Sequence, residues 1–120
     1  MTTFARILAG AVDATPGAIG GGFAAADGEL VDASATGDAH EWALITAHYG
    51  VILATVEAAL GTKHFGGTEY FVVVNRTLEI AVHTVDDGYY ALLAMSRPAP
   101  LARALGNLSA AAEQLRREMR

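Results

Sequence analysis

The sequence contains no cysteine and few charged residues. Because none of its 120 residues is a cysteine, a disulfide framework, a zinc–thiolate centre and a cysteine nucleophile are excluded. Charged residues make up 18% of the chain, below the ~25% that is typical of soluble domains. We therefore expect another protein to cover part of the uncharged surface.

Positive charge is scarce as well. Eight Lys and Arg stand against thirteen Asp and Glu, for a net charge of −5, and the basic residues form no stripe that could follow a phosphate backbone. We expect no nucleic-acid partner. Residues 1–6 show no signal sequence, and no segment approaches the ~18 uninterrupted apolar residues of a membrane span. The sequence thus predicts a single cytoplasmic domain over residues 1–120 with no membrane partner.

The spacing of apolar residues predicts the order helix, two strands, helix, three strands, helix. The first helix follows a capping Thr2 or Thr3 and ends at Pro16-Gly17, and Asp38 caps the central helix, which stops at Gly61. Asp27-Gly28 predicts a tight hairpin turn. The expected strands are 18–26, 29–36, 68–74, 78–85 and 89–95, and the last helix runs over 101–119.

These elements predict an α+β fold. The five strands, joined mostly by hairpins, would form an antiparallel sheet, and the helices are long enough to cover it in layers. We expect the central helix on one face of the sheet and the N- and C-terminal helices on the other. The run Gly20-Gly21-Gly22 in the first strand is best explained by close packing of a helix on the strand, since no phosphate-loop pattern follows it.

The central helix carries apolar residues on two faces of a helical wheel. Thr46, Gly50 and Glu57 separate the faces on one side. Another helix of the same chain could cover the second face, but we favour a second copy of the chain, because two-fold homodimers are the commonest oligomers. The face that suits the sheet comprises Trp42, Ile45, Tyr49, Ile52, Leu53, Val56 and Leu60. The second face, with small side chains that permit close helix packing, comprises Leu44, Ala47, Val51, Ala54 and Ala58.

The strand that begins at Tyr70 supports the same expectation. If it lies at an edge of the sheet, it is an uncharged edge without proline, of the kind that proteins usually hide. Pairing with its copy in a second chain would hide it. We therefore expect Tyr70, Val72 and Val74 to contribute to a dimer interface.

The sequence offers no catalytic or metal-binding motif. His40, His48, His64 and His83 form no pair at metal-ligand spacing, and we expect no metal and no cofactor. Asp86-Asp87 and Asp27 are explained by turns, where Asp is common for backbone reasons. No serine lies in a nucleophile-elbow pattern. We therefore expect no enzymatic activity.

Four stretches of the chain are distinctive: Thr15-Pro16-Gly17-Ala18, Ala26-Asp27-Gly28-Glu29-Leu30-Val31, Asp87-Gly88-Tyr89-Tyr90-Ala91-Leu92-Leu93 and the leucine-spaced last helix. Together they resemble the Roadblock/LC7 domain family, as a stand-alone prokaryotic, MglB-like member. The resemblance covers residues 3–119. It implies a homodimer in which the central helices pack antiparallel and the third strands pair at their edges.

The resemblance also implies a function. Members of this family are platforms for small Ras-like GTPases, and the MglB-like ones accelerate GTP hydrolysis by positioning residues of the GTPase. By this likeness the docking region would surround His40, His48, Lys63 and His64. Two other functions stay open: a signalling scaffold without a GTPase, and a small-molecule sensor whose pocket would be lined by Trp42, Tyr49 and Tyr89.

Overall fold

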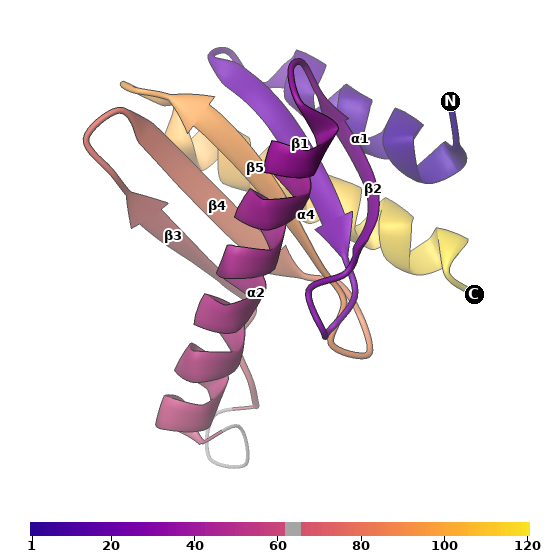
Figure 1. The fold of residues 1–120 in the computed structure, drawn as a ribbon, viewed down its shortest axis with the longest axis vertical. Coiled ribbons are helices and arrows are strands. Elements are labelled where there is room, and N and C mark those ends of the chain that lie inside the picture. Colours follow the sequence, from indigo (N-terminus) through magenta and orange to yellow (C-terminus); the bar gives the residue numbers. More distant parts are fainter. Residues whose placement is uncertain (62–65) are drawn as a thin grey trace.

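In the part of the chain that the structure describes, three helices and five strands follow one another in the predicted order. The structure is a computed structural model that describes residues 1–61 and 66–120. The elements are α1 (Thr3–Ala14), β1 (Ala18–Ala24), β2 (Leu30–Ala35), α2 (Ala39–Leu60), β3 (Tyr70–Val74), β4 (Leu78–Thr84), β5 (Tyr90–Ser96) and α4 (Leu101–Glu118). Figure 1 traces this path from the N-terminal to the C-terminal helix.

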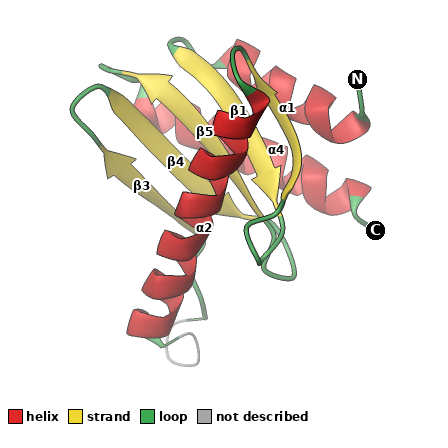
Figure 2. Cartoon of the chain, in the orientation of Figure 1, coloured by secondary structure: helices red, strands yellow, loops and turns green. Residues whose placement is uncertain are grey.

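The strands form one antiparallel sheet in the order β2-β1-β5-β4-β3. Strand β5 lies in the middle, between β1 and β4, although it comes last in the sequence. Helix α2 covers one face, and α1 and α4 lie side by side on the other (Figure 2). The predicted fold class and the predicted placement of the helices are therefore confirmed.

Each face of the sheet has its own apolar core. The core under α1 and α4 includes Leu8, Phe23 and Leu108, whereas the core under α2 includes Trp42, Leu53 and Leu92. Two helices lie on the α1/α4 face, where α1 contacts β1 and β2, and α4 contacts β4 and β5. On the α2 face the described residues place one helix, which crosses the sheet and continues past its end (Figure 1).

The glycines of β1 allow α2 to lie close to the sheet, as the sequence predicts. A Cβ at Gly20 would lie 2.4 Å from the Trp42 ring, and one at Gly22 would lie 2.8 Å from Thr46 Oγ1. Neither distance is sterically possible unless the helix or these side chains shift. The middle glycine, Gly21, faces α1 instead, where a Cβ would meet Val12 and Leu8 at ordinary contact distances.

Helix α2 is turned differently from its predicted orientation. Its buried residues are Trp42, Thr46, Gly50 and Leu53. The prediction that Thr46 and Gly50 separate two apolar faces is therefore wrong, because both lie against the sheet. The hydroxyl of Tyr90 from β5 donates to the Thr46 carbonyl (2.7 Å) and occupies the space that a side chain at position 50 would need.

The same rotation leaves part of the predicted sheet face in solvent. Ile52 is 37% exposed and Leu60 is 57% exposed, so the prediction that both pack on the sheet is wrong. Ile52 is turned away by the rotation. Leu60 lies in the last turn of α2, where the helix has passed the end of the sheet (Figure 1).

Candidate functional site

The exposed side of α2 is unusually apolar. Leu44 is 49% exposed and Val51 66% exposed, and Ala54 and Ala58 are also exposed. Only 17% of the most apolar 18-residue stretch of the helix is buried. A surface helix normally turns charged and polar residues outward, so this helix presents a surface of the kind that marks an interaction site.

By length and composition, α2 is also apolar enough to cross a membrane. The expectation that no segment approaches a membrane span therefore needs correction. One such helix is weak evidence for a span, however, because an interface helix passes the same test. The contacts of Trp42, Thr46 and Gly50 with β1 and β5 favour the interface helix, since spanning a bilayer would require α2 to leave the sheet.

Three sides of α2 can be distinguished by what they face. The β3 flank faces the β3 side of the sheet, because the Tyr49 hydroxyl accepts a hydrogen bond from Asn75 Nδ2 (3.4 Å) in the turn after β3, and Tyr49 and Phe71 both pack against the core under α2. The hairpin flank faces the β1–β2 and β4–β5 turns, and the crest points away from the sheet. The β3 flank comprises Ile45, Tyr49, Ile52 and Val56. The hairpin flank comprises Ala47, Gly50, Ala54 and Glu57. The crest comprises Leu44, His48, Val51, Thr55 and Ala58.

The second apolar face predicted from the sequence is divided between two of these sides. Leu44, Val51 and Ala58 lie on the crest. Ala47 and Ala54 line the hairpin flank, where a Cβ at Gly28 in the β1–β2 turn would lie 3.4 Å from the Ala47 Cα. Ala47 and Ala54 are thus separated from β3 by the width of the helix.

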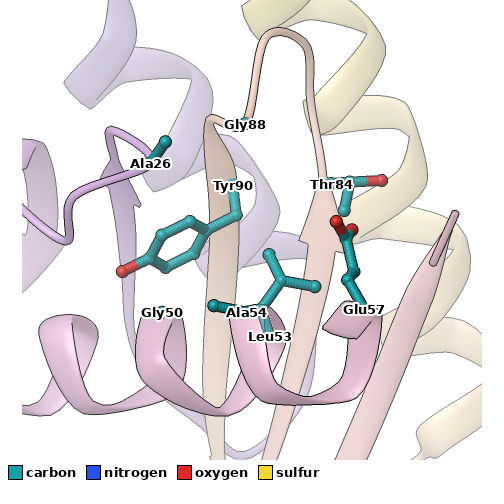
Figure 3. A pocket seen from close by; sticks show the side chains of 8 residues that line it. All are labelled: Ala26, Gly50, Leu53, Ala54, Glu57, Thr84, Gly88 and Tyr90. Carbon is teal, nitrogen blue, oxygen red and sulfur yellow. The ribbon is translucent and has the colours of Figure 1, made fainter. Parts of the chain in front are cut away.

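A groove runs along the hairpin flank. It consists of two adjoining cavities of about 210 Å³ and 120 Å³, which share Ala26, Gly50 and Ala54. We call it the hairpin groove. Figure 3 shows the larger cavity, with the Tyr90 ring reaching across between Ala26 and Gly50. The residues that complete its wall are Asp27, Gly28, Ala47, Val51, Leu53, Glu57, Thr84, Gly88 and Tyr90.

Tyr90 connects this groove to the core. Its side chain is 1% exposed, and its hydroxyl donates to the Thr46 carbonyl. Burial raises the pKa of the Tyr90 hydroxyl, and the negative charge of Asp27 raises it further. The negative charge of Asp27 therefore acts on the Tyr90 hydroxyl at the bottom of the groove.

Strand β3 lies at an edge of the sheet, as the interface prediction requires. Tyr70 is 48% exposed and Val74 53% exposed, whereas Val72 is half-buried. The Thr84 N–H donates to the Glu69 carbonyl and the Asn75 N–H donates to the Leu78 carbonyl. Since alternate residues of an antiparallel strand bond to the same neighbour, the odd-numbered residues of β3 bond to β4. The N–H and C=O groups of Tyr70, Val72 and Val74 therefore point outward.

The opposite edge, strand β2, is protected. Asp32 in β2 accepts a hydrogen bond from the Thr2 hydroxyl, which also caps α1. A charged side chain and a covering helix are devices that prevent an edge from pairing with another chain. Strand β3 has no charged residue within its bounds, so β3 is the better candidate for pairing with a second chain.

The predicted partner-binding residues are only partly within the described structure. His40 and His48 are both exposed on α2, and the His40 N–H donates to the capping Asp38 carboxylate (2.9 Å). Lys63 and His64 lie outside the described residues. In the part of the chain that is described, no three His, Asp or Glu side chains are grouped so that they could hold a metal ion.

The aromatic residues proposed for a sensor pocket do not share one. Trp42 and Tyr49 pack in the core under α2. Tyr89 packs on the opposite face of the sheet, with its ring centroid 5.7 Å from that of Phe23. The sheet separates them, so they cannot contact one ligand.

The hairpin groove was not predicted from the sequence. Its walls come from α2, the β1–β2 turn and the β4–β5 turn, which are far apart in the chain. The available signal was Gly50, a glycine within a long helix, where it costs about 1 kcal/mol relative to alanine. Such a residue indicates that something approaches the helix closely, and here it is Tyr90.

Comparison with known proteins identifies the fold. No protein-family model matches the sequence, and no curated protein matches it. Among solved structures, a Roadblock/LC7 domain from Streptomyces avermitilis superimposes with a TM-score of 0.86 at 16% identity, covering 96% of each chain. The gliding protein MglB from Thermus thermophilus gives 0.82 at 15% identity, covering 98% of this chain and 91% of MglB.

A further structure, of MglB in a tetrameric arrangement, gives a TM-score of 0.82 at 16% identity and covers 98% of this chain and 90% of that one. These alignments extend over nearly the whole of both chains. The protein therefore has the Roadblock/LC7 fold throughout its length.

Proposed function

We propose that this protein is a non-enzymatic, homodimeric regulator or scaffold of a small Ras-like GTPase, acting in the cytoplasm. The observation that carries the proposal is the coincidence of an exposed apolar helix, α2, with an unprotected edge strand, β3, on one side of the molecule. The fold supports it, because the structural likeness includes two MglB structures, one of them in a tetrameric arrangement.

The proposed dimer pairs β3 with β3 of a second copy. In an antiparallel strand pair, two side chains that lie opposite each other are on the same face of the sheet. A two-fold axis that relates two copies of β3 must therefore place one residue opposite its own copy, and it cannot pass between two neighbouring residues. If the axis is centred on Val72, Tyr70 pairs with Val74 of the partner subunit. All the outward N–H and C=O groups of β3 then take part in hydrogen bonds between the two strands. The two sheets would then join into one.

The same two-fold axis brings α2 toward α2 of the second copy. The β3 flank faces the axis, so Ile52 on that flank would be covered first, together with Leu44, Val51 and Ala58 of the crest. Ala47 and Ala54, which the sequence assigned to the interface, lie on the hairpin flank and belong to the groove. The proposed interface on α2 therefore excludes them.

The GTPase partner is proposed from the family resemblance, in which the dimer is a platform and the GTPase does the chemistry. The test is to mix the purified protein with the small GTPase encoded nearest to it, and to measure both complex formation and GTP hydrolysis. We expect binding, with hydrolysis accelerated if the protein is an activator. Binding with an unchanged rate would indicate a scaffold. Absence of both binding and acceleration would contradict the proposal.

A further inference from the structure

The polar side chains that line the hairpin groove offer no free hydrogen-bond donor. Thr84 uses its hydroxyl proton on the carbonyls of Thr68 and Glu69 (both 3.0 Å), and Tyr90 uses its own on Thr46 (2.7 Å). Neither hydroxyl therefore has a proton left for a ligand, and Tyr90 itself is buried at the bottom of the groove. Asp27 and Glu57 add carboxylates, which accept only. The groove is therefore chemically matched to a ligand that is rich in donors.

The groove is also negatively charged and apolar at once. Asp27 stands on the β1–β2 turn and Glu57 on α2, so the two carboxylates belong to different walls. Among the described residues, no Lys, Arg or His lines either cavity, and no basic group lies within ion-pair distance of Asp27 or Glu57. Between the carboxylates, Ala26, Leu53 and Ala54 form apolar walls (Figure 3).

The raised pKa of Tyr90 supports this description of the groove. Asp27 is the second cause of the shift, after burial, so the carboxylate acts across the groove on a group at its bottom. A cation that entered would therefore experience an attractive potential in a partly desolvated site, where charge interactions are screened less than in water.

We propose that the hairpin groove receives an arginine side chain of the partner protein. Arginine combines a long apolar stem, which suits the alanine and leucine walls, with a planar cation that carries five donors. Its guanidinium is more weakly hydrated than a lysine ammonium, so it enters a partly apolar site more readily. The larger cavity of about 210 Å³ corresponds to roughly seven water volumes of about 30 Å³, which is sufficient for one such side chain.

This inference deepens the proposed function, on which it rests for the identity of the partner as a GTPase. The groove lies on the flank of α2 that faces away from β3, and only Val51 at its rim belongs also to the proposed interface, so the groove stays open when β3 pairs with a second copy. Each dimer would present two such grooves, one beside each α2. Glu57 would accept the guanidinium at one end of the groove and Asp27 would attract it from the other.

The test uses the intact protein and short peptides, without a GTPase. Acetyl-Gly-Arg-Gly-amide is titrated into ¹⁵N-labelled protein, and acetyl-Gly-citrulline-Gly-amide, which has nearly the same shape without the charge, serves as its control. We expect the arginine peptide to shift the amide resonances of Gly50, Ala54 and Gly88 in the millimolar range. The citrulline peptide should bind at least fivefold more weakly.

Two matched variants test whether the Glu57 carboxylate binds the arginine peptide. Glu57→Gln preserves size and should weaken the arginine peptide at least fivefold, whereas Glu118→Gln, on the exposed side of α4, should leave its binding unchanged. The inference is overturned if the citrulline peptide binds equally well, if Glu57→Gln has no effect, or if the shifts map elsewhere. It is also overturned if the same amides shift with protein concentration alone, since a second copy would then occupy the groove.

The outcome is separable from that of the proposed function. If the peptide binds as expected but no GTPase does, the groove stands and the GTPase partner is wrong. If a GTPase binds but neither the peptide nor Glu57→Gln behaves as expected, the GTPase docks elsewhere and the groove inference is wrong.

Discussion

Replacing Gly50 with alanine tests the closest helix–sheet contact of the fold. An alanine Cβ at this position would lie 2.3 Å from the Tyr90 hydroxyl oxygen and 2.8 Å from Cζ of the same ring. These distances are too short for unbonded atoms, so either α2 must rise from the sheet or the Tyr90 ring must move. Either response breaks the hydrogen bond from Tyr90 to the Thr46 carbonyl.

Three effects set the size of the change in the free energy of unfolding. Overpacking a well-filled core costs about 1–3 kcal/mol. Loss of the Tyr90 hydrogen bond costs about 1 kcal/mol more. Alanine is a better helix former than glycine by about 1 kcal/mol, which offsets the second effect. We therefore expect Gly50→Ala to destabilise the protein by about 2 kcal/mol.

A matched substitution in α4 separates packing from helix propensity. Gly106 also lies within a helix, but a Cβ there would have no atom within 4 Å. Gly106→Ala should therefore stabilise the protein by about 0.5–1 kcal/mol. Both variants are unfolded in urea at one protomer concentration and followed by circular dichroism.

The comparison has a clear negative result. If Gly50→Ala stabilises the protein as Gly106→Ala does, α2 does not approach Tyr90 as the structure describes. The double variant Gly50→Ala with Tyr90→Phe provides a further control, because it removes the atom at 2.3 Å and leaves the one at 2.8 Å. It should show a smaller penalty for the alanine than the Tyr90 background does.

Three further predictions concern the edges of the sheet and the Tyr90 hydroxyl. Val72→Pro removes two outward N–H groups per dimer, and each lost hydrogen bond costs about 0.5–1.5 kcal/mol. The dissociation constant of the dimer, measured by ultracentrifugation, should therefore rise about 5- to 150-fold while the monomer fold stays intact. Val73→Pro instead breaks a bond to β4 and should lower stability in urea. Asp32→Val removes the charge that protects β2, so size-exclusion chromatography should show species larger than those of the wild type; an unchanged profile would mean that Asp32 does not guard this edge. Burial and Asp27 raise the pKa of Tyr90, so the unfolded chain releases the hydroxyl proton before the folded chain does. The stability that this group contributes is therefore complete below about pH 10 and declines as the pH rises above that value. Urea denaturation of Tyr90→Phe should show a shallower decline of stability with pH, and an equal decline would exclude Tyr90 as its source.

The order of elements could be predicted because short-range signals determine it. Asp27-Gly28 forms the hairpin turn, with Gly28 at φ 87°, and Asp38 caps α2 through the His40 N–H. Gly61 ends α2 at φ 67°. Each of these signals lies within a few residues of the structure that it specifies, so no knowledge of distant contacts was needed.

The orientation of α2 could not be predicted because its buried line is not its most hydrophobic one. Thr46 and Gly50 face the sheet since their small size admits Tyr90 and fits over Gly22. Periodicity weighs hydrophobicity, and it places bulky residues such as Ile52 inward. Which residue fits against the sheet depends on side chains of β1 and β5, and the sequence of α2 alone does not contain this information.

From the sequence, the position of β3 at an edge of the sheet could be assumed but not predicted. An edge strand and a central strand with the pattern Tyr-Phe-Val-Val-Val look alike, because both are apolar. The strand order places β3 outermost, since β5 inserts between β1 and β4. The hairpin groove could not be predicted from the sequence at all, because Ala26, Glu57 and Thr84 come together only after the whole chain has folded.

The central claim is that β3 pairs with its own copy about Val72, and single cysteines test it most directly. Because the chain has no cysteine, each variant from Tyr70→Cys to Val74→Cys carries one thiol. At the axis the two Cα atoms would be about 5.5 Å apart, within disulfide range, and they move apart with each step from it. Under mild oxidation, non-reducing electrophoresis should show covalent dimer most strongly for Val72→Cys and less at positions 71 and 73. A flat profile, a maximum at position 70 or 74, or no covalent dimer would contradict the account.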